Sequence, residues 1–195
     1  MISIVWYDHE GVIQADSFHI LRDMRLYLAL LYAFQRFSDS NWGVCPELAD
    51  NSVTIEGIKY ELKTGRGDLI HAPWAIKGRA TTVLRCEKQG SSEKFVAKIS
   101  YPQVSRVPEP KVLDDAKRIG GTVGSAVSDH IPDLKDSCVL PYATASFRNV
   151  LGLLPETDKP SGRHLVVLIM GALDGTIREL SGKEYWDVWW DCFIC

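Results

Sequence analysis

The stretch GRATTVLRCEKQGSSEKFVAKIS, residues 78–100, decides the fold that we expect for this chain. Two segments, at about 74–86 and 94–100, contain the apolar and β-branched residues that are typical of strands. The polar segment between them contains glycine and serine, which favour a turn. The sequence therefore predicts a β-hairpin, with a glycine-containing loop before its first strand and a lysine, Lys98, in its second.

The loop before the hairpin has the sequence GRATTV, residues 78–83. A loop that covers phosphate groups needs backbone amides close to the phosphate oxygens, and small side chains allow that approach. Gly78, Ala80, Thr81 and Thr82 offer such small side chains. Within this loop we expect phosphate contacts from Gly78, Ala80, Thr81 and Val83. The alternative is an ordinary hairpin turn, which the glycine alone would also explain.

Lys98 is the one long cation in an otherwise apolar strand segment, FVAKI. The two-residue period of a strand places Val96 and Lys98 on one face, with Phe95, Ala97 and Ile99 on the other. A solvent-exposed lysine at a sheet edge is the alternative interpretation. The glycine-containing loop before it favours phosphate binding by the ammonium group of Lys98.

A phosphate-binding lysine of this type needs a carboxylate that holds its ammonium group in place. Glu109 is the first candidate, because Pro110 predicts the start of a helix over about 109–119. An acidic residue in the first turn of a helix also interacts favourably with the helix dipole, so a purely structural role is the alternative. Asp114 and Asp115 are the other candidates.

The remaining sequence alternates short strand and helix patterns, which suits an α+β domain with an antiparallel sheet. Further strands are predicted within 2–14 and at 52–55, 58–63, 68–70, 138–143 and 164–169. A helix is predicted from Asp16 or Ser17 to about Phe37, with an apolar face of Ile20, Leu21, Met24, Leu28, Leu31 and Tyr32. Glycines 120, 121 and 124 are expected to end the helix that starts near 109, and 125–165 are expected to be rich in loops.

We divide the chain into an N-terminal extension (1–57), a main domain (58–172) and a C-terminal segment (173–195). In the last of these, Ser181 and Glu184 form a capping-box pattern that predicts a helix. This predicted helix carries a broad aromatic face. Exposed aromatic clusters of this kind usually mark an interface. We therefore expect a surface for a protein partner or for self-association, formed by Trp186, Trp189, Trp190 and Phe193.

Composition restricts the classes of function. The chain has 195 residues, 46% of them hydrophobic, and a formal net charge of −3, so it can bury a core but has no basic field to recruit nucleic acid. No apolar run reaches the roughly 18 residues of a membrane-spanning helix, and the N-terminus lacks a secretory signal. The five scattered cysteines favour a reducing compartment. We therefore expect a soluble, intracellular and cytoplasmic protein that binds neither nucleic acid nor membrane.

Several motifs, in their order along the chain, resemble those of the fungal-type protein kinase family. They are Trp6-Tyr7-Asp8, the turn DSNWG at 39–43, the loop GRATTV, Val96-Ala97-Lys98, Arg106 with Glu109, Arg163-His164-Leu165 and WDVWWDC at 186–192. The resemblance implies a kinase-like small lobe in which residues 78–83 cover the phosphates of ATP, Lys98 contacts them and Glu109 positions Lys98. It also implies a hinge that binds adenine at about Met170 to Ala172, followed by the first helix of a large lobe.

The sequence departs from the family after the aromatic segment. It contains neither an HRD-type catalytic loop nor an Asp-Phe-Gly-type metal-binding motif. Without them no group accepts the substrate hydroxyl proton, and no Mg²⁺ bridges the phosphates. We therefore expect a truncated relative of the ATP-dependent Ser/Thr kinases that is inactive by itself, with weak ATP binding and no magnesium site. The alternative is a non-catalytic interaction module that uses the aromatic helix.

Overall fold

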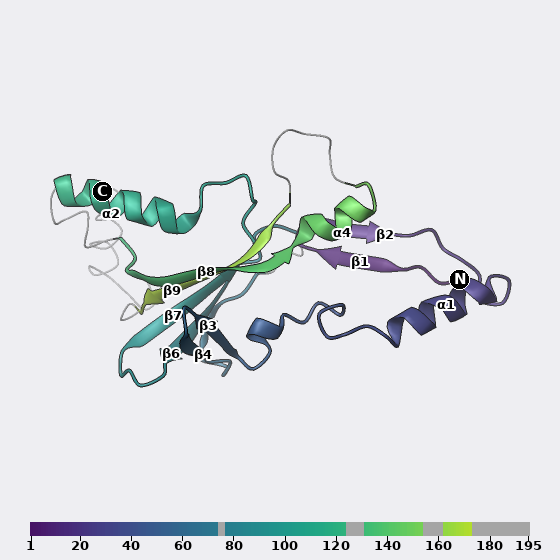
Figure 1. Ribbon diagram of the computed structural model, residues 1–195, viewed down its shortest axis with the longest axis horizontal. Coiled ribbons are helices and arrows are strands. Elements are labelled where there is room, and N and C mark those ends of the chain that lie inside the picture. Colours follow the sequence, from purple (N-terminus) through teal and green to yellow (C-terminus); the bar gives the residue numbers. More distant parts are fainter. Residues whose placement is uncertain (74–76, 124–130, 154–161, 173–195) are drawn as a thin grey trace, which may run out of the picture.

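The computed structural model describes residues 1–73, 77–123, 131–153 and 162–172 (Figure 1). Within them the chain is α+β and is dominated by an antiparallel sheet, as the sequence predicts. The strands are β1 (Val5–Asp8), β2 (Gly11–Gln14), β3 (Ser52–Ile55), β4 (Ile58–Leu62), β5 (Leu69–His71), β6 (Thr82–Lys88), β7 (Lys94–Ser100), β8 (Leu134–Ala143) and β9 (His164–Gly171). The helices are α1 (Met24–Phe34), the short 3-10 helix η1 (Pro46–Leu48), α2 (Glu109–Val123) and α4 (Thr144–Val150).

The main sheet has seven strands, in the order β3-β4-β6-β7-β9-β8, with β5 paired to β6 beside this path. β6 and β7 form the predicted hairpin, and Val83 lies directly opposite Lys98 in its register. α2 follows β7 in the chain and lies toward one end of the molecule, whereas α1 and the separate β1–β2 hairpin lie toward the other (Figure 1). The sheet thus occupies the centre and carries the hairpin with Lys98.

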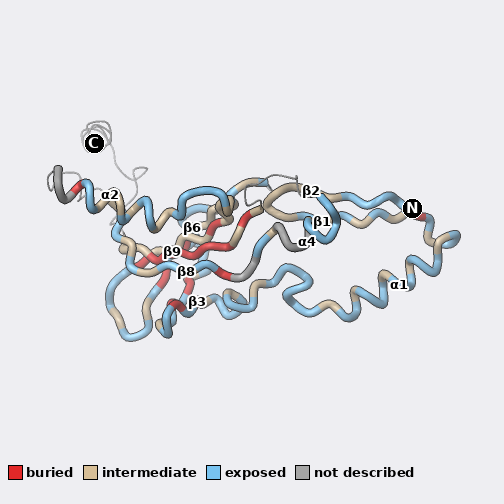
Figure 2. The backbone as a smooth tube through the Cα atoms, turned by 45° about the horizontal axis from the view of Figure 1, so that its top comes forward, coloured by how far each residue is buried: buried red, intermediate tan, exposed pale blue. Residues whose placement is uncertain are grey.

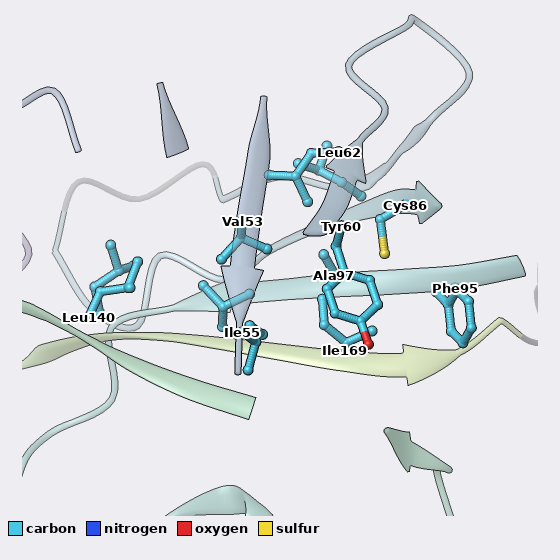
Figure 3. Packing of buried hydrophobic residues seen from close by; sticks show 12 residues of the cluster. Val53, Ile55, Tyr60, Leu62, Cys86, Phe95, Ala97, Leu140 and Ile169 are labelled. Carbon is cyan, nitrogen blue, oxygen red and sulfur yellow. The ribbon is translucent and has the colours of Figure 1, made fainter. Parts of the chain in front are cut away.

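Buried side chains gather in the sheet (Figure 2). β9 is buried on both faces, since Leu165, Val167 and Ile169 belong to the core while Val166 and Leu168, on the opposite face, are buried as well. This burial explains why β9 reads as a continuous apolar run rather than an alternating one. Figure 3 shows the core cluster, which consists of Val53, Ile55, Tyr60, Leu62, Leu84, Cys86, Phe95, Ala97, Leu140, Leu165, Val167 and Ile169.

Helix α1 is shorter than the sequence predicts, and it is exposed. It begins at Met24 rather than near residue 16, because Phe18 is buried and is held in extended backbone by a β-bridge to Ile2. The expected apolar face is not covered in the described part of the chain: no residue of α1 is buried, and Leu28 is 55% exposed. The apolar spacing therefore predicted a helix here, but not where it begins.

Two further boundaries differ from expectation. α2 continues through Gly120 and Gly121 to Val123, since glycine in a helix interior costs only about 1 kcal/mol and does not by itself end the helix; Gly124 lies outside the described residues. α4 was not predicted at all, and it occupies seven residues that were expected to form a loop. In the described part of the chain, no helix combines the length and the apolar character needed to cross a membrane.

The Tyr60→Phe variant is expected to lose about 1–2 kcal/mol of unfolding free energy. Tyr60 is only 1% exposed, and its hydroxyl hydrogen-bonds to Asp136 of β8. Burial, reinforced by Asp136, raises the pKa of Tyr60, so the hydroxyl stays protonated and donates. Urea unfolding of this variant should be compared with that of Tyr7→Phe, at a tyrosine that is 60% exposed. Equal losses in the two variants would contradict the account.

Candidate functional site

The central contact of the candidate site is an ion pair between β7 and α2. The Nζ atom of Lys98 lies 2.5 Å from Oε1 of Glu109, the first residue of α2. Both side chains are partly buried, with 20% and 31% of their surface exposed. The segment between strand and helix is ordered by turns, including the amide of Arg106 bonded to the carbonyl of Gln103. The structure therefore brings together the lysine and the carboxylate that the sequence singled out.

A second cation shares the same carboxylate. The Nη2 atom of Arg79 lies 3.2 Å from Oε2 of Glu109. Two positive side chains thus surround one negative side chain, which leaves a formal charge of +1 at this corner and suits an anionic ligand. Sequence reasoning missed Arg79, although its position directly after Gly78, in the predicted phosphate loop, was an available signal.

The loop residues 78–80 adopt unusual backbone angles and are tied to their surroundings. Gly78 has φ +126° and Ala80 has φ +42°, both in the left-handed region that glycine tolerates and alanine does not favour. The amide of Gly78 donates to the carbonyl of His9 (2.9 Å), and the amide of Tyr101 donates to the carbonyl of Arg79 (2.6 Å). The Gly78 amide is thus engaged by the protein in this arrangement.

The remaining predicted residues lie in the strands near Lys98 or directly before them. Thr81 directly precedes β6, and Val83 lies across from Lys98. Met170 is in β9, where it lies between Val96 of β7 and Leu134 of β8. Whether any of them contacts a nucleotide stays a prediction.

The backbone after Met170 is also engaged within the protein. The amide of Gly171 donates to the carbonyl of Asp133, and the amide of Ala172 donates to the carbonyl of Lys94, both at 3.0 Å. These two amides are therefore occupied and cannot at the same time donate to an adenine ring.

Of the other predicted features, some lie elsewhere in the structure and others lie outside the described residues. Asp115 pairs with Arg118 along α2 at 3.2 Å. The carboxylate beside Lys98 is that of Glu109. The predicted aromatic surface (Trp186, Trp189, Trp190 and Phe193) lies outside the described residues, as does the C-terminal segment 173–195. Across the described ranges, no group of three or more His, Cys, Asp or Glu side chains is placed to hold a metal ion.

Ion pairs also fix the β1–β2 hairpin beside the loop. Arg148 of α4 donates two hydrogen bonds to the carboxylate of Asp8, at 2.8 and 2.7 Å, and both side chains are largely buried. Arg163 lies 3.1 Å from Glu10 at the same hairpin turn. These contacts join residues far apart in sequence, so no local pattern could have predicted them.

Asp8 is expected to stabilise the folded chain only while it is ionised. Burial acts to raise its pKa, but hydrogen bonds and charge from Arg148, with two backbone amides, outweigh burial and hold the pKa below its ordinary value. A lowered folded-state pKa adds stability above the unfolded-state value of about 3.9, and this stability disappears as the pH falls through the folded-state value. Wild type should be more stable to urea than Asp8→Asn at about pH 6, and this advantage should shrink at about pH 2.5. An unchanged advantage would contradict the assignment.

A known protein family matches the larger part of the chain. A family model described as fungal protein kinase matches residues 1–137, which is more than half of the chain and includes the β1–β2 hairpin, the glycine loop, Lys98 and Glu109. The match ends within β8, so the motif at 163–165 and the aromatic segment lie beyond it. No curated protein matches the chain, and no solved structure does. The resemblance stated from the sequence is confirmed, and the chain belongs to the fungal protein kinase family.

Proposed function

We propose that this chain binds the phosphate groups of ATP at the corner formed by Lys98, Arg79 and Glu109. The observation that carries the proposal is the 2.5 Å ion pair between Lys98 in β7 and Glu109 in α2. In protein kinases a strand lysine contacts the nucleotide phosphates and is positioned by a glutamate of the neighbouring helix, while a glycine-rich loop covers the phosphates. A strand lysine, a helix glutamate and a loop that contains one glycine also lie together here, and this supports the proposal in a chain of the fungal protein kinase family.

The sheet supports the same interpretation. β6, β7, β9 and β8 are antiparallel neighbours, and α2 connects β7 to β8. We interpret residues 58–172 as a kinase-like small lobe that follows an N-terminal extension over 1–57. In this interpretation the loop before β6 is the phosphate loop, and the end of β9 leads into the hinge.

The charges of the corner suit a phosphate ligand. Glu109 accepts from both cations in this structure, so a phosphate group that draws Arg79 away leaves Lys98 still held by Glu109. Lys98 then acts as a fixed point charge, and the guanidinium of Arg79 can pair with phosphate oxygens in a bidentate manner. We expect both phosphate contacts to come from side chains more than from the Gly78 amide, which is bonded to His9.

We further propose that the chain by itself binds ATP weakly and transfers no phosphate. Glu109 lies in the first turn of α2. The amides of Gly171 and Ala172 are engaged within the protein, so an adenine ring gains few hydrogen bonds from this edge. The sequence has no HRD-type or Asp-Phe-Gly-type motif to supply the catalytic base and metal ligands. A magnesium ion would therefore arrive only with the nucleotide.

Calorimetric titration of the purified chain with ATP, ADP and adenosine tests the proposal. Because phosphate contacts carry the affinity, ATP should bind most tightly, ADP less tightly and adenosine least, and added salt should weaken ATP binding. Equal affinities for ATP and adenosine, or no binding of ATP, would overturn it. A parallel incubation with labelled ATP, Mg²⁺ and a generic protein substrate should give no transfer; robust Mg²⁺-dependent transfer would refute the inactive state.

A further inference from the structure

The turn of the β1–β2 hairpin, residues 8–11, is closed by its own aspartate. The carboxylate of Asp8 accepts hydrogen bonds from the amides of Glu10 (2.8 Å) and Gly11 (3.1 Å). The same carboxylate receives the bidentate pair from Arg148 of α4. Asp8 therefore shapes the turn and attaches it to the body of the domain at once. Figure 1 shows the hairpin alongside α4.

A second ion pair attaches the turn near β9. Glu10 lies 3.1 Å from the Nε atom of Arg163, which is 9% exposed. The Nη1 atom of Arg163 also donates to the carbonyl of Tyr101 at 2.9 Å. Arg163 thus joins the hairpin turn to the chain segment that directly follows β7. The contact with Glu10 is an ion pair between two largely buried side chains, and such pairs are screened less by solvent than exposed ones.

Between these two ion pairs, His9 contacts the glycine loop. Its carbonyl accepts a hydrogen bond from the amide of Gly78, and the centroid of its ring lies 3.8 Å from that of the Tyr101 ring. The amide of Tyr101 in turn donates to the carbonyl of Arg79. Gly78 is therefore hydrogen-bonded to the hairpin turn directly, and Arg79 is linked to it through Tyr101, whose ring contacts that of His9.

The loop needs such support. Gly78 and Ala80 both have positive φ angles, and a non-glycine residue keeps that conformation only when its surroundings impose it. Arg79 lies between them and directs its guanidinium toward Glu109 at 3.2 Å. A loop free to relax would carry Arg79 away from this corner.

We propose that the β1–β2 turn is a brace that positions the glycine loop, so that the N-terminal extension controls how well the phosphate corner is formed. Asp8 and Glu10 are its positioning residues: they act on Gly78 and Arg79 through His9 and the two arginines, and touch no ligand themselves. The effect on nucleotide affinity rests on the proposed function, whereas the effect on the loop does not.

The test removes the attachment of the brace while leaving the hairpin intact. Arg148→Met deletes the guanidinium that holds Asp8, and Arg118→Met, at an exposed arginine of α2, is the matched control. Hydrogen–deuterium exchange of peptides that cover the loop should be about tenfold faster in Arg148→Met, with β9 unchanged. Arg148→Lys, which keeps the charge but not the bidentate geometry, should be intermediate.

The affinity for ATP should fall about three- to tenfold in Arg148→Met and stay unchanged in Arg118→Met, because a loop that is no longer preorganised must be ordered on binding. Unchanged loop exchange, or faster exchange over the whole chain, overturns the brace. Faster loop exchange with no change in ATP affinity supports the brace and counts against the nucleotide site. If Arg148→Met does not fold, Glu10→Gln provides the same comparison at the second ion pair.

Discussion

The Lys98→Ala variant is expected to lose the thermal stabilisation that ATP gives to the wild-type chain. The substitution removes the ammonium group next to Glu109 and leaves that carboxylate to Arg79 alone. A hydrogen bond to a charged group is worth about 1.5–3 kcal/mol, so the affinity for ATP should fall roughly 10- to 100-fold. Differential scanning fluorimetry over a range of ATP concentrations measures this loss.

Lys94→Ala is the matched control, because Lys94 is an exposed lysine at the start of the same strand, β7. It should keep the wild-type response to ATP. Without ATP, Lys98→Ala should itself unfold close to the wild-type temperature, since ion pairs with substantial exposure contribute about 1 kcal/mol or less. An equal ATP response in wild type and Lys98→Ala would remove Lys98 from the site.

The second large effect is expected at the centre of the sheet. Ile169 is completely buried in β9, opposite Ala97 of β7 and next to β8. Ile169→Ala should lower the unfolding free energy by about 2–5 kcal/mol, because it removes buried apolar surface and leaves a cavity. Urea unfolding followed by circular dichroism measures the change.

Val139→Ala provides the comparison on the neighbouring strand. Val139 lies in β8 and is 62% exposed, so its truncation should cost about 0.5 kcal/mol or less. Similar losses at positions 139 and 169 would contradict the assignment of the core to β9 and its neighbours.

The sheet could be predicted from the sequence because strand periodicity is a local signal. The hairpin of β6 and β7 was predicted from two strand-like segments around a polar turn, and β9 from its continuous apolar run. The two strands near the N-terminus also agree with the prediction, as do β3, β4 and β5. In each case the strand could be recognised from residues that follow one another in the chain.

The helices were predicted less well, because their ends depend on contacts between distant residues. α1 starts late because Phe18 bridges to Ile2, which the helical spacing of later residues does not reveal. The glycines of α2 were read as a stop signal, although their cost in a helix is small. Tertiary contacts such as the bridge between Phe18 and Ile2 override local propensity.

The candidate site was predictable only in part. Lys98 and Glu109 were paired from their positions in a strand and at a helix start, and they do lie together. Arg79 was overlooked because its contact with Glu109, which is 30 positions later in the sequence, exists only in the folded chain. The brace at Asp8 joins residues 140 positions apart, and no local signal in the sequence indicates such a pair.

Covalent labelling with an acyl-phosphate derivative of ATP tests the central claim most directly. Such a reagent transfers its acyl group to a lysine amine beside the bound phosphates, with the nucleotide as leaving group. We predict that mass spectrometry finds the label on Lys98, that excess ATP prevents the labelling, and that adenosine does not. Labelling that spreads over exposed lysines such as Lys94, or that excess ATP leaves unchanged, would contradict a phosphate site at Lys98.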